Sequence, residues 1–91
     1  MAIEVRIPTI LRTYTNGEKA VDAEGATLTD LIENLEAKHP GLGDRLLDNG
    51  ELRRFINVYV NDEDVRFEGG LAKELTDGDV VVILPAVAGG A

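Results

Sequence analysis

The sequence predicts one α+β domain, in which a single main helix packs across one face of a mixed sheet of about five strands. Three patterns lead to this prediction. Apolar residues alternate near the N-terminus, a central segment has helical periodicity, and a β-branched run lies near the C-terminus. With 91 residues, the chain has room for one domain only.

The N-terminal segment predicts a β-hairpin with a long connection. Ile3, Val5 and Ile7 alternate with charged residues, which is typical of a strand with one buried face. Pro8 ends this strand or places it at a sheet edge. The dipeptide at 16–17, Asn-Gly, is a strong turn signal, and residues 18–23 form a second, weaker strand.

The clearest helix follows Thr27, a good N-cap residue that has Asp30 three positions later. Because Pro40 disfavours helix in the residue before it, the helix should end near His39. Glu33 and Glu36 fall on the opposite face, where we expect solvated carboxylates. The apolar stripe that predicts the helix comprises Leu28, Leu31, Ile32 and Leu35.

The second half of the chain predicts mainly strands. Residues 41–50 look irregular, with a short helical turn around 44–47, and residues 55–61 alternate as a third strand. In that strand Ile56, Val58 and Val60 share one face, opposite Phe55, Asn57 and Tyr59. Residues 65–67 are expected to form a short fourth strand, residues 71–75 a helical turn, and residues 77–79 a tight turn.

The run 80–84 is nearly continuous in β-branched residues and predicts a strand that is buried on both faces in the middle of the sheet. The resulting order of elements is that of the β-grasp, or ubiquitin-like, roll, which we assign to residues 1–84. Pro85 has no N–H to donate and should stop the sheet pairing. Residues 85–91 then form a flexible C-terminal tail that contains Gly-Gly.

Composition argues against an enzyme. The chain has no cysteine, no serine and a single histidine, which excludes thiolate metal sites, cysteine nucleophiles, serine triads and multi-histidine metal sites. The acidic turn at 62–64 does not have the spacing of a calcium loop. The glycines at 69–70 lack the P-loop lysine, so we interpret them as a chain reversal. No bound metal or cofactor is therefore expected.

Charge and hydropathy limit the environment and the partners. The net charge of −8 disfavours nucleic acid and anionic membranes and favours a basic protein partner, although it is also what keeps a small domain soluble. The N-terminus lacks a signal-peptide pattern, and the run 80–88 is too short to span a bilayer. We therefore expect a cytoplasmic protein.

The tail 86–91 consists of small residues and cannot bury enough apolar surface to fold onto the domain. An extended tail of this kind suits a narrow slot on another protein. A glycine carboxylate, with no Cβ beside it, can also approach a nucleotide closely. On composition alone, an ordinary frayed terminus explains the same residues equally well.

Residues 77–90 join an acidic-Gly-acidic turn, a hydrophobic strand, a proline and Gly-Gly. This sequence resembles the closing signature of the ThiS/MoaD family of ubiquitin-like sulfur carriers. Residues 7–12, 55–67 and 69–71 are similar to the CysO branch, which serves cysteine biosynthesis. The resemblance covers essentially the whole chain.

The resemblance implies a carrier on which partner enzymes act. A ubiquitin-activating-like enzyme would use ATP and Mg²⁺ to adenylate the Gly90 carboxylate, with Gly89 as the spacer, and sulfur transfer would give a thiocarboxylate. A PLP-dependent cysteine synthase would then add that sulfur to the aminoacrylate made from O-phosphoserine. A JAMM-type zinc metalloprotease would release cysteine and would also remove Ala91, which the family pattern lacks.

Two other functions stay open at this point: the small subunit of a MoaD-like molybdopterin synthase, and a ubiquitin-like modifier or interaction module that forms isopeptide bonds. In each case the partner would bind next to the tail. The residues predicted to contact it are Phe55, Tyr59, Phe67, Pro85, Ala86, Val87 and Ala88.

Overall fold

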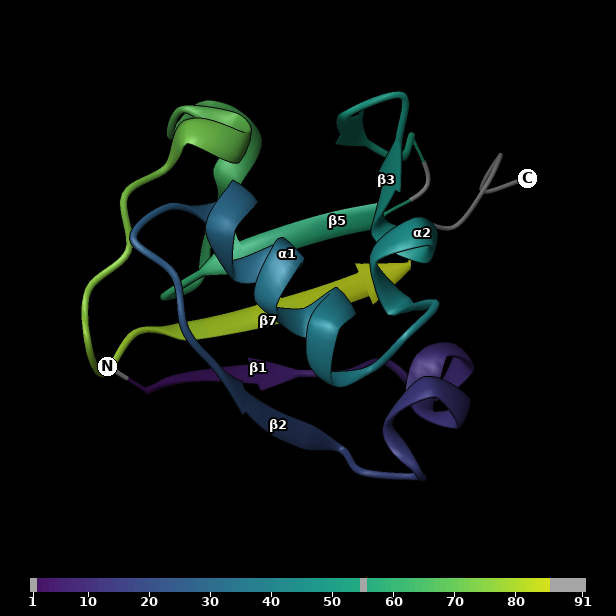
Figure 1. The fold of residues 1–91 in the computed structure, drawn as a ribbon. Helices are drawn as coiled ribbons and strands as arrows, with labels where there is room; N and C mark the ends of the chain where they lie inside the picture. Colours follow the sequence, from purple (N-terminus) through teal and green to yellow (C-terminus); the bar gives the residue numbers. More distant parts are fainter. Residues whose placement is uncertain (1, 55, 86–91) are drawn as a thin grey trace.

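The computed structural model describes residues 2–54 and 56–85, and in them a five-stranded mixed sheet carries one main helix on one face (Figure 1). The strand order is β2-β1-β7-β5-β6, with β1 and β7 parallel and the other neighbours antiparallel. The predicted α+β class and the single helical layer are confirmed. The strands are β1 (Ile3–Arg6), β2 (Ala20–Ala23), β5 (Ile56–Val60), β6 (Glu63–Asp64) and β7 (Val80–Pro85).

The predicted N-terminal hairpin is present, since β1 and β2 pair antiparallel. The long connection between them contains a 3₁₀ helix, η1 (Thr9–Thr15), that the sequence analysis did not predict. Asn16 and Gly17 both have positive φ, as the turn signal required. Buried Thr15 holds the loop together, because its hydroxyl donates to the carbonyl of Arg12 at 3.2 Å and to that of Glu18 at 2.9 Å.

Helix α1 (Leu28–Lys38) has the predicted bounds and cap. The Thr27 hydroxyl accepts a hydrogen bond from the backbone N–H of Asp30 at 3.3 Å. The four predicted apolar residues are all buried against the sheet, where they pack with alternate residues of β1, β5 and β7. The helix ends at His39, as the following proline indicated.

The segment after α1 is more ordered than predicted. Helix α2 (Leu42–Leu46) begins two residues before the expected turn. It begins there because the Glu36 carboxylate, half-buried rather than solvated as expected, accepts hydrogen bonds from the backbone N–H groups of Gly41 and Gly43. Next comes an unpredicted two-stranded hairpin of β3 (Leu47–Asp48) and β4 (Glu51–Leu52).

The predicted fourth strand at 65–67 is wrong. These residues form a 3₁₀ helix, η2 (Val65–Phe67), and the strand that pairs with β5 is β6. The physical reason is a local cap: the Asp64 carboxylate accepts from the backbone N–H of Arg66 at 2.9 Å and turns the chain. A further 3₁₀ helix, η3 (Gly70–Ala72), replaces the helical turn expected at 71–75.

Strand β7 lies in the middle of the sheet, as predicted, but it is buried on one face only. Val81 and Ile83 are buried beneath the helical layer, whereas Val82 is half-buried and Leu84 is 44% exposed on the other face. The strand also runs one residue further than expected, since Pro85 lies opposite Ile56. A proline is tolerated there because the end of a strand does not require its missing donor.

The start of β7 is fixed by Asp79. Its carboxylate accepts from the backbone N–H of Thr76 at 2.8 Å, the Thr76 hydroxyl at 3.2 Å and the Asn61 amide at 3.0 Å. The backbone N–H of Thr76 and then the Asn61 amide lower the pKa of Asp79 below its usual value, against a smaller opposing effect of burial. The same Asn61 side chain accepts from the N–H of Val80 at 3.1 Å, which ties the turn to the strand.

We expect Asp79→Asn to lower the stability of the fold at neutral pH. The stability of this variant should also fall less steeply as the pH is lowered into the acid range. A carboxylate whose pKa is depressed in the folded state stabilises the protein above its unfolded pKa of about 3.9, and that contribution is lost as pH falls through the folded value. Urea midpoints measured between neutral pH and strong acid should therefore converge for the two proteins as pH falls. Glu33→Gln, which removes an exposed carboxylate from α1, controls for net charge.

Candidate functional site at the end of the central strand

The predicted functional tail continues from β7, the middle strand of the five. Pro85 is the last described residue before it and is exposed. The predicted site residues Phe55, Ala86, Val87, Ala88, Gly89, Gly90 and Ala91 lie outside the described residues. The described part of the site is therefore the surface around the end of β7.

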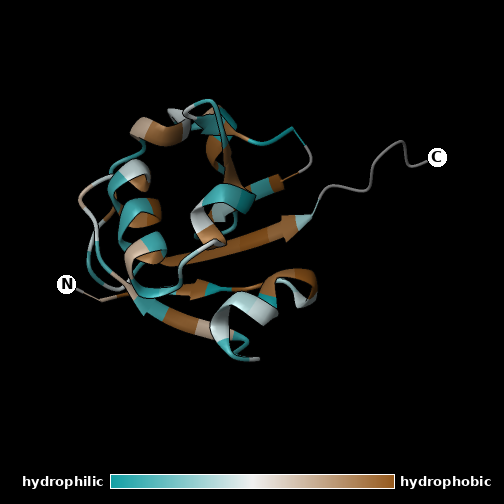
Figure 2. Cartoon of the chain, turned by 45° about the vertical axis from the view of Figure 1, so that its right-hand side comes forward, coloured by the Kyte–Doolittle hydropathy of each residue, from teal (hydrophilic) through white to brown (hydrophobic). Residues whose placement is uncertain are grey.

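On the sheet face that α1 leaves open, β7 forms an apolar stripe. Val82 and Leu84 point to this face, because they alternate with buried Val81 and Ile83. Tyr59 of β5 is directly opposite Val82 in the sheet register and therefore shares its face. Figure 2 shows that β7 is hydrophobic along most of its length. This open-face stripe (Val82, Leu84 and Tyr59) leads along the sheet toward the tail.

Polar groups flank the open-face stripe on the neighbouring strands. On β1, Arg6 and Glu4 form an ion pair at 2.8 Å, and Arg6 is opposite Val82. On β5, the Asn57 side chain is opposite Leu84 and accepts from the Arg66 guanidinium at 2.6 Å. An apolar strip with a polar border is the usual anatomy of a protein–protein contact surface.

Two of the predicted contact residues, Tyr59 and Phe67, lie on different elements of the structure. Tyr59 is a half-buried residue of β5 in the open-face stripe, whereas Phe67 belongs to η2 and is 84% exposed. Sequence reasoning missed Leu84 as a surface residue, because the β-branched run was interpreted as a strand buried on both faces. A helical layer on only one side of the sheet, which the single long amphipathic segment already implied, could have identified it.

The described residues offer little to bind metal or membrane. Within 2–54 and 56–85, no group of three or more histidine, cysteine, aspartate or glutamate side chains could hold a metal ion. In the acidic turn at 62–64, the Asp64 carboxylate is used in the cap of η2. Over the same part of the chain, no helix has the length and hydropathy to cross a bilayer.

Residues 5–90 match the ThiS family. The chain belongs to this family. It is 58% identical to the sulfur carrier protein CysO of Mycobacterium tuberculosis, in an alignment that covers 99% of this chain and 100% of that protein. It is also 37% identical to small archaeal modifier protein 3 of Haloferax volcanii, over 99% of this chain and 100% of that protein.

A solved structure shares both sequence and fold. The crystal structure of the Amycolatopsis orientalis BexX/CysO complex contains a chain that is 61% identical, with a TM-score of 0.93, over 98% of this chain and 100% of that chain. These likenesses confirm the ubiquitin-like β-grasp fold and the predicted resemblance to sulfur carriers and to the CysO branch. They do not test the roles predicted for single residues.

Proposed function

We propose that this chain is a cytoplasmic sulfur carrier whose C-terminal glycine, Gly90, is adenylated and then converted to a thiocarboxylate. In the first step the carboxylate attacks ATP, pyrophosphate leaves, and an acyl-adenylate forms. In the second step a sulfur donor displaces AMP, so that one carboxylate oxygen is replaced by sulfur. A ubiquitin-activating-like enzyme supplies ATP, Mg²⁺ and the catalytic groups, and this chain binds no cofactor of its own.

The observation that carries the proposal is the position of β7, the strand from which the tail continues. Residues 86–91 follow directly from β7, which pairs with β1 on one side and β5 on the other. The tail therefore starts from the middle strand of the sheet, which both neighbouring strands hold in position. Gly89 and Gly90 have no Cβ, and so the terminal carboxylate can enter a narrow slot and reach a nucleotide.

The chemistry explains why the partner enzymes, and not this chain, would supply the catalytic groups. A carboxylate is a poor electrophile until it is adenylated, and that step requires a nucleotide and a metal ion. A thiocarboxylate is an ionised sulfur nucleophile at neutral pH, and attachment to a protein delivers it at a high effective concentration. Because the chain has no cysteine, no thiol of its own competes for the adenylate.

We further propose the CysO-type acceptor. A PLP-dependent cysteine synthase would form an aminoacrylate from O-phosphoserine, and the carrier sulfur would add to it. A JAMM-type zinc protease would then release cysteine, and would also remove Ala91 before the first cycle. The whole-chain identity of 58% to a CysO protein supports this acceptor.

The open-face stripe supports a docking role for the sheet. Leu84 is 44% exposed and Tyr59 is half-buried, so an enzyme that takes the tail can cover both as it approaches. Pro85, Ala86, Val87 and Ala88 would lead from this contact into the active site, with Gly89 and Gly90 beyond them. Phe55 and Phe67 stay predicted as further contact residues.

A protein modifier is the second candidate, because a relative of 37% identity is named a small archaeal modifier protein. In that function the adenylated glycine would form an isopeptide bond to a lysine of a target protein. The fold and the Gly-Gly tail serve both functions equally well. The two functions differ in the nucleophile that attacks the adenylate. It is sulfur for a sulfur carrier and a lysine amine for a modifier.

The proposal is tested by incubating the chain that ends at Gly90 with the activating enzyme, ATP, Mg²⁺ and a sulfur donor. Intact mass should show one oxygen replaced by sulfur, and fragmentation should place the change on Gly90. Failure to form either adenylate or thiocarboxylate contradicts the proposal. Isopeptide adducts in cell extracts would favour the modifier, and a large subunit that co-purifies stably would favour the small subunit of a molybdopterin synthase.

A further inference from the structure

A groove of about 820 Å³ lies beside the base of the tail, with Pro85 in its lining. Its other walls come from η1, α2, β3, the segment that follows β4, and the start of β5. The groove is separate from the open-face stripe, because none of the stripe residues Val82, Leu84 and Tyr59 lines the groove. Any protein that holds residues 86–91 must pass close to this groove.

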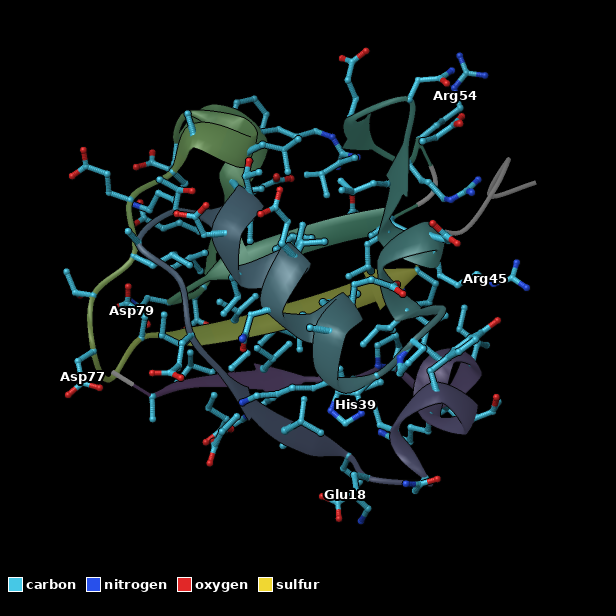
Figure 3. All side chains as sticks on the ribbon, viewed as in Figure 1. Glu18, His39, Arg45, Arg54, Asp77 and Asp79 are labelled. Carbon is cyan, nitrogen blue, oxygen red and sulfur yellow. The ribbon has the colours of Figure 1, made fainter. Side chains whose placement is uncertain are left out.

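The groove concentrates positive charge in an acidic protein. Arg45, Arg53 and Arg54 all line it, which is three of the nine Lys and Arg residues in a chain of net charge −8. Asp48 is the carboxylate among the lining residues. Figure 3 shows Arg45 and Arg54 on the side of the molecule opposite to Asp77 and Asp79. Three arginines thus gather around the groove that Pro85 lines, where the tail begins.

Two of these arginines are held in place by the fold. The Arg45 Nε donates to the Tyr14 hydroxyl at 2.7 Å, and its guanidinium lies 5.7 Å from the centroid of that ring. The Arg53 Nε donates to the carbonyl of Asp44 at 2.8 Å. Guanidinium groups that are already oriented lose less conformational entropy when they bind a carboxylate.

Apolar surface lies between the arginines. Ile10 of η1 is 61% exposed and lines the groove together with Pro85. Behind them, buried Leu11 and Ile56 close the floor. The groove therefore combines an accessible apolar contact with a cationic border, and a complementary segment needs an apolar side chain flanked by carboxylates.

We propose that this groove docks an acidic segment of the activating enzyme, with an apolar side chain of that segment seated on Ile10 and Pro85. The inference rests on the proposed function, since it names the surface by which the activating enzyme recognises this carrier. The tail itself is a poor occupant of the groove for two reasons. Residues 86–91 have a single carboxylate to offer three arginines, and the activating enzyme must reach that same carboxylate. Although the chain has a net charge of −8, the three arginines of the groove would attract a negatively charged segment locally.

The test measures binding of the 91-residue chain to the activating enzyme by calorimetry, at low and at high NaCl. Arg54→Glu, and the double variant Arg45→Glu/Arg54→Glu, should raise Kd by about tenfold or more at low salt. The salt dependence of binding should fall in the same variants. Lys19→Glu makes an equal change in charge on an exposed residue outside the groove and should alter Kd by no more than about twofold. Arg54 is exposed, so its single variant remains informative if loss of the Arg45–Tyr14 contact perturbs folding.

Three results would overturn the inference: an unchanged Kd in the groove variants, an equal loss of affinity in Lys19→Glu, or tighter binding after charge reversal. The last would mean that the groove faces a basic segment of the enzyme, or that it holds the chain's own tail in the free protein. Binding is measured without turnover, so the two proposals fail separately. An enzyme that binds the wild type through the groove but never modifies Gly90 contradicts the proposed function alone.

Discussion

The chain that ends at Gly90 should be converted to a thiocarboxylate at least about a hundredfold faster than the chain that retains Ala91. The additional residue moves the carboxylate by about 3.3–3.6 Å along an extended tail. It also places a methyl group where the two preceding residues have none. Because adenylation depends on the position of the attacking oxygen, a displacement of this size takes the reacting atom out of range of the nucleotide.

The measurement is the initial rate of thiocarboxylate formation, followed by intact mass with the activating enzyme, ATP and a sulfur donor, and without protease. Ala91→Gly separates the two causes, because it restores a glycine terminus while keeping the extra length. Thermal midpoints of the three chains should agree, since the change comes six residues after the end of β7 in the sequence. Thiocarboxylate on Ala91 at a rate similar to that of the shorter chain would contradict the need for processing.

Features encoded by neighbouring residues could be predicted from the sequence. The Thr27 cap and the apolar stripe of α1 depend on residues within a few positions of one another, and both appear where expected. The turn at 77–79 follows from the positive φ that Gly78 adopts. The central place of β7 followed from its hydropathy, because the middle strand of a sheet is expected to be the most shielded.

Errors arose where contacts between distant parts of the chain, or between side chain and backbone, decide the structure. The run at 65–67 has the composition of a strand, but a hydrogen bond from Arg66 N–H to the Asp64 carboxylate turns it into η2. Leu84 lies in a run whose composition suggests a strand buried on both faces. The one long helix covers only one face of the sheet, and Leu84 points to the other. The hydropathy of this run correctly predicted a strand that pairs with a neighbour on each side. It could not show whether other elements cover both faces of that strand or only one.

The basic groove was missed for the same reason. Arg53 and Arg54 are adjacent in the sequence, but Arg45 comes from α2, and the packing of α2 against η1 brings it to Tyr14. The position of α2 in turn depends on Glu36, which the sequence analysis placed on a solvated surface. A hydrogen bond between a side chain on α1 and backbone five to seven residues later leaves no periodic signal.

Glu36→Ala should destabilise the fold by roughly 2–4 kcal/mol, a large part of the total of about 5–14 kcal/mol expected for a domain of this size. The Glu36 carboxylate accepts from Gly43 N–H at 2.8 Å and from Gly41 N–H at 3.0 and 3.1 Å. Bonds to a charged acceptor are stronger than neutral ones, and truncation leaves both donors without this partner. Urea unfolding should show a lower midpoint with an unchanged slope.

The two glycines show how closely the loop between α1 and α2 packs on its neighbours. A Cβ at Gly43 would lie 2.9 Å from Glu36 Oε1, and one at Gly41 would lie 2.9 Å from Tyr14 Cε1. The loop is therefore in close contact with both α1 and η1. Without Glu36 we expect α2 to shift and to carry Arg45 away from Tyr14, so that affinity for the activating enzyme falls along with stability.

Matched variants on the same helix separate this role from helix propensity and charge. Glu33→Ala removes an exposed carboxylate three residues earlier in α1 and should change stability by less than about 0.5 kcal/mol. Glu36→Gln keeps an acceptor oxygen without the charge, so its stability should lie between the wild type and Glu36→Ala. If Glu36→Ala proves no worse than Glu33→Ala, the carboxylate does not hold α2. The two glycines would then fix the loop through backbone conformation alone, since Gly41 already adopts a φ of +97°.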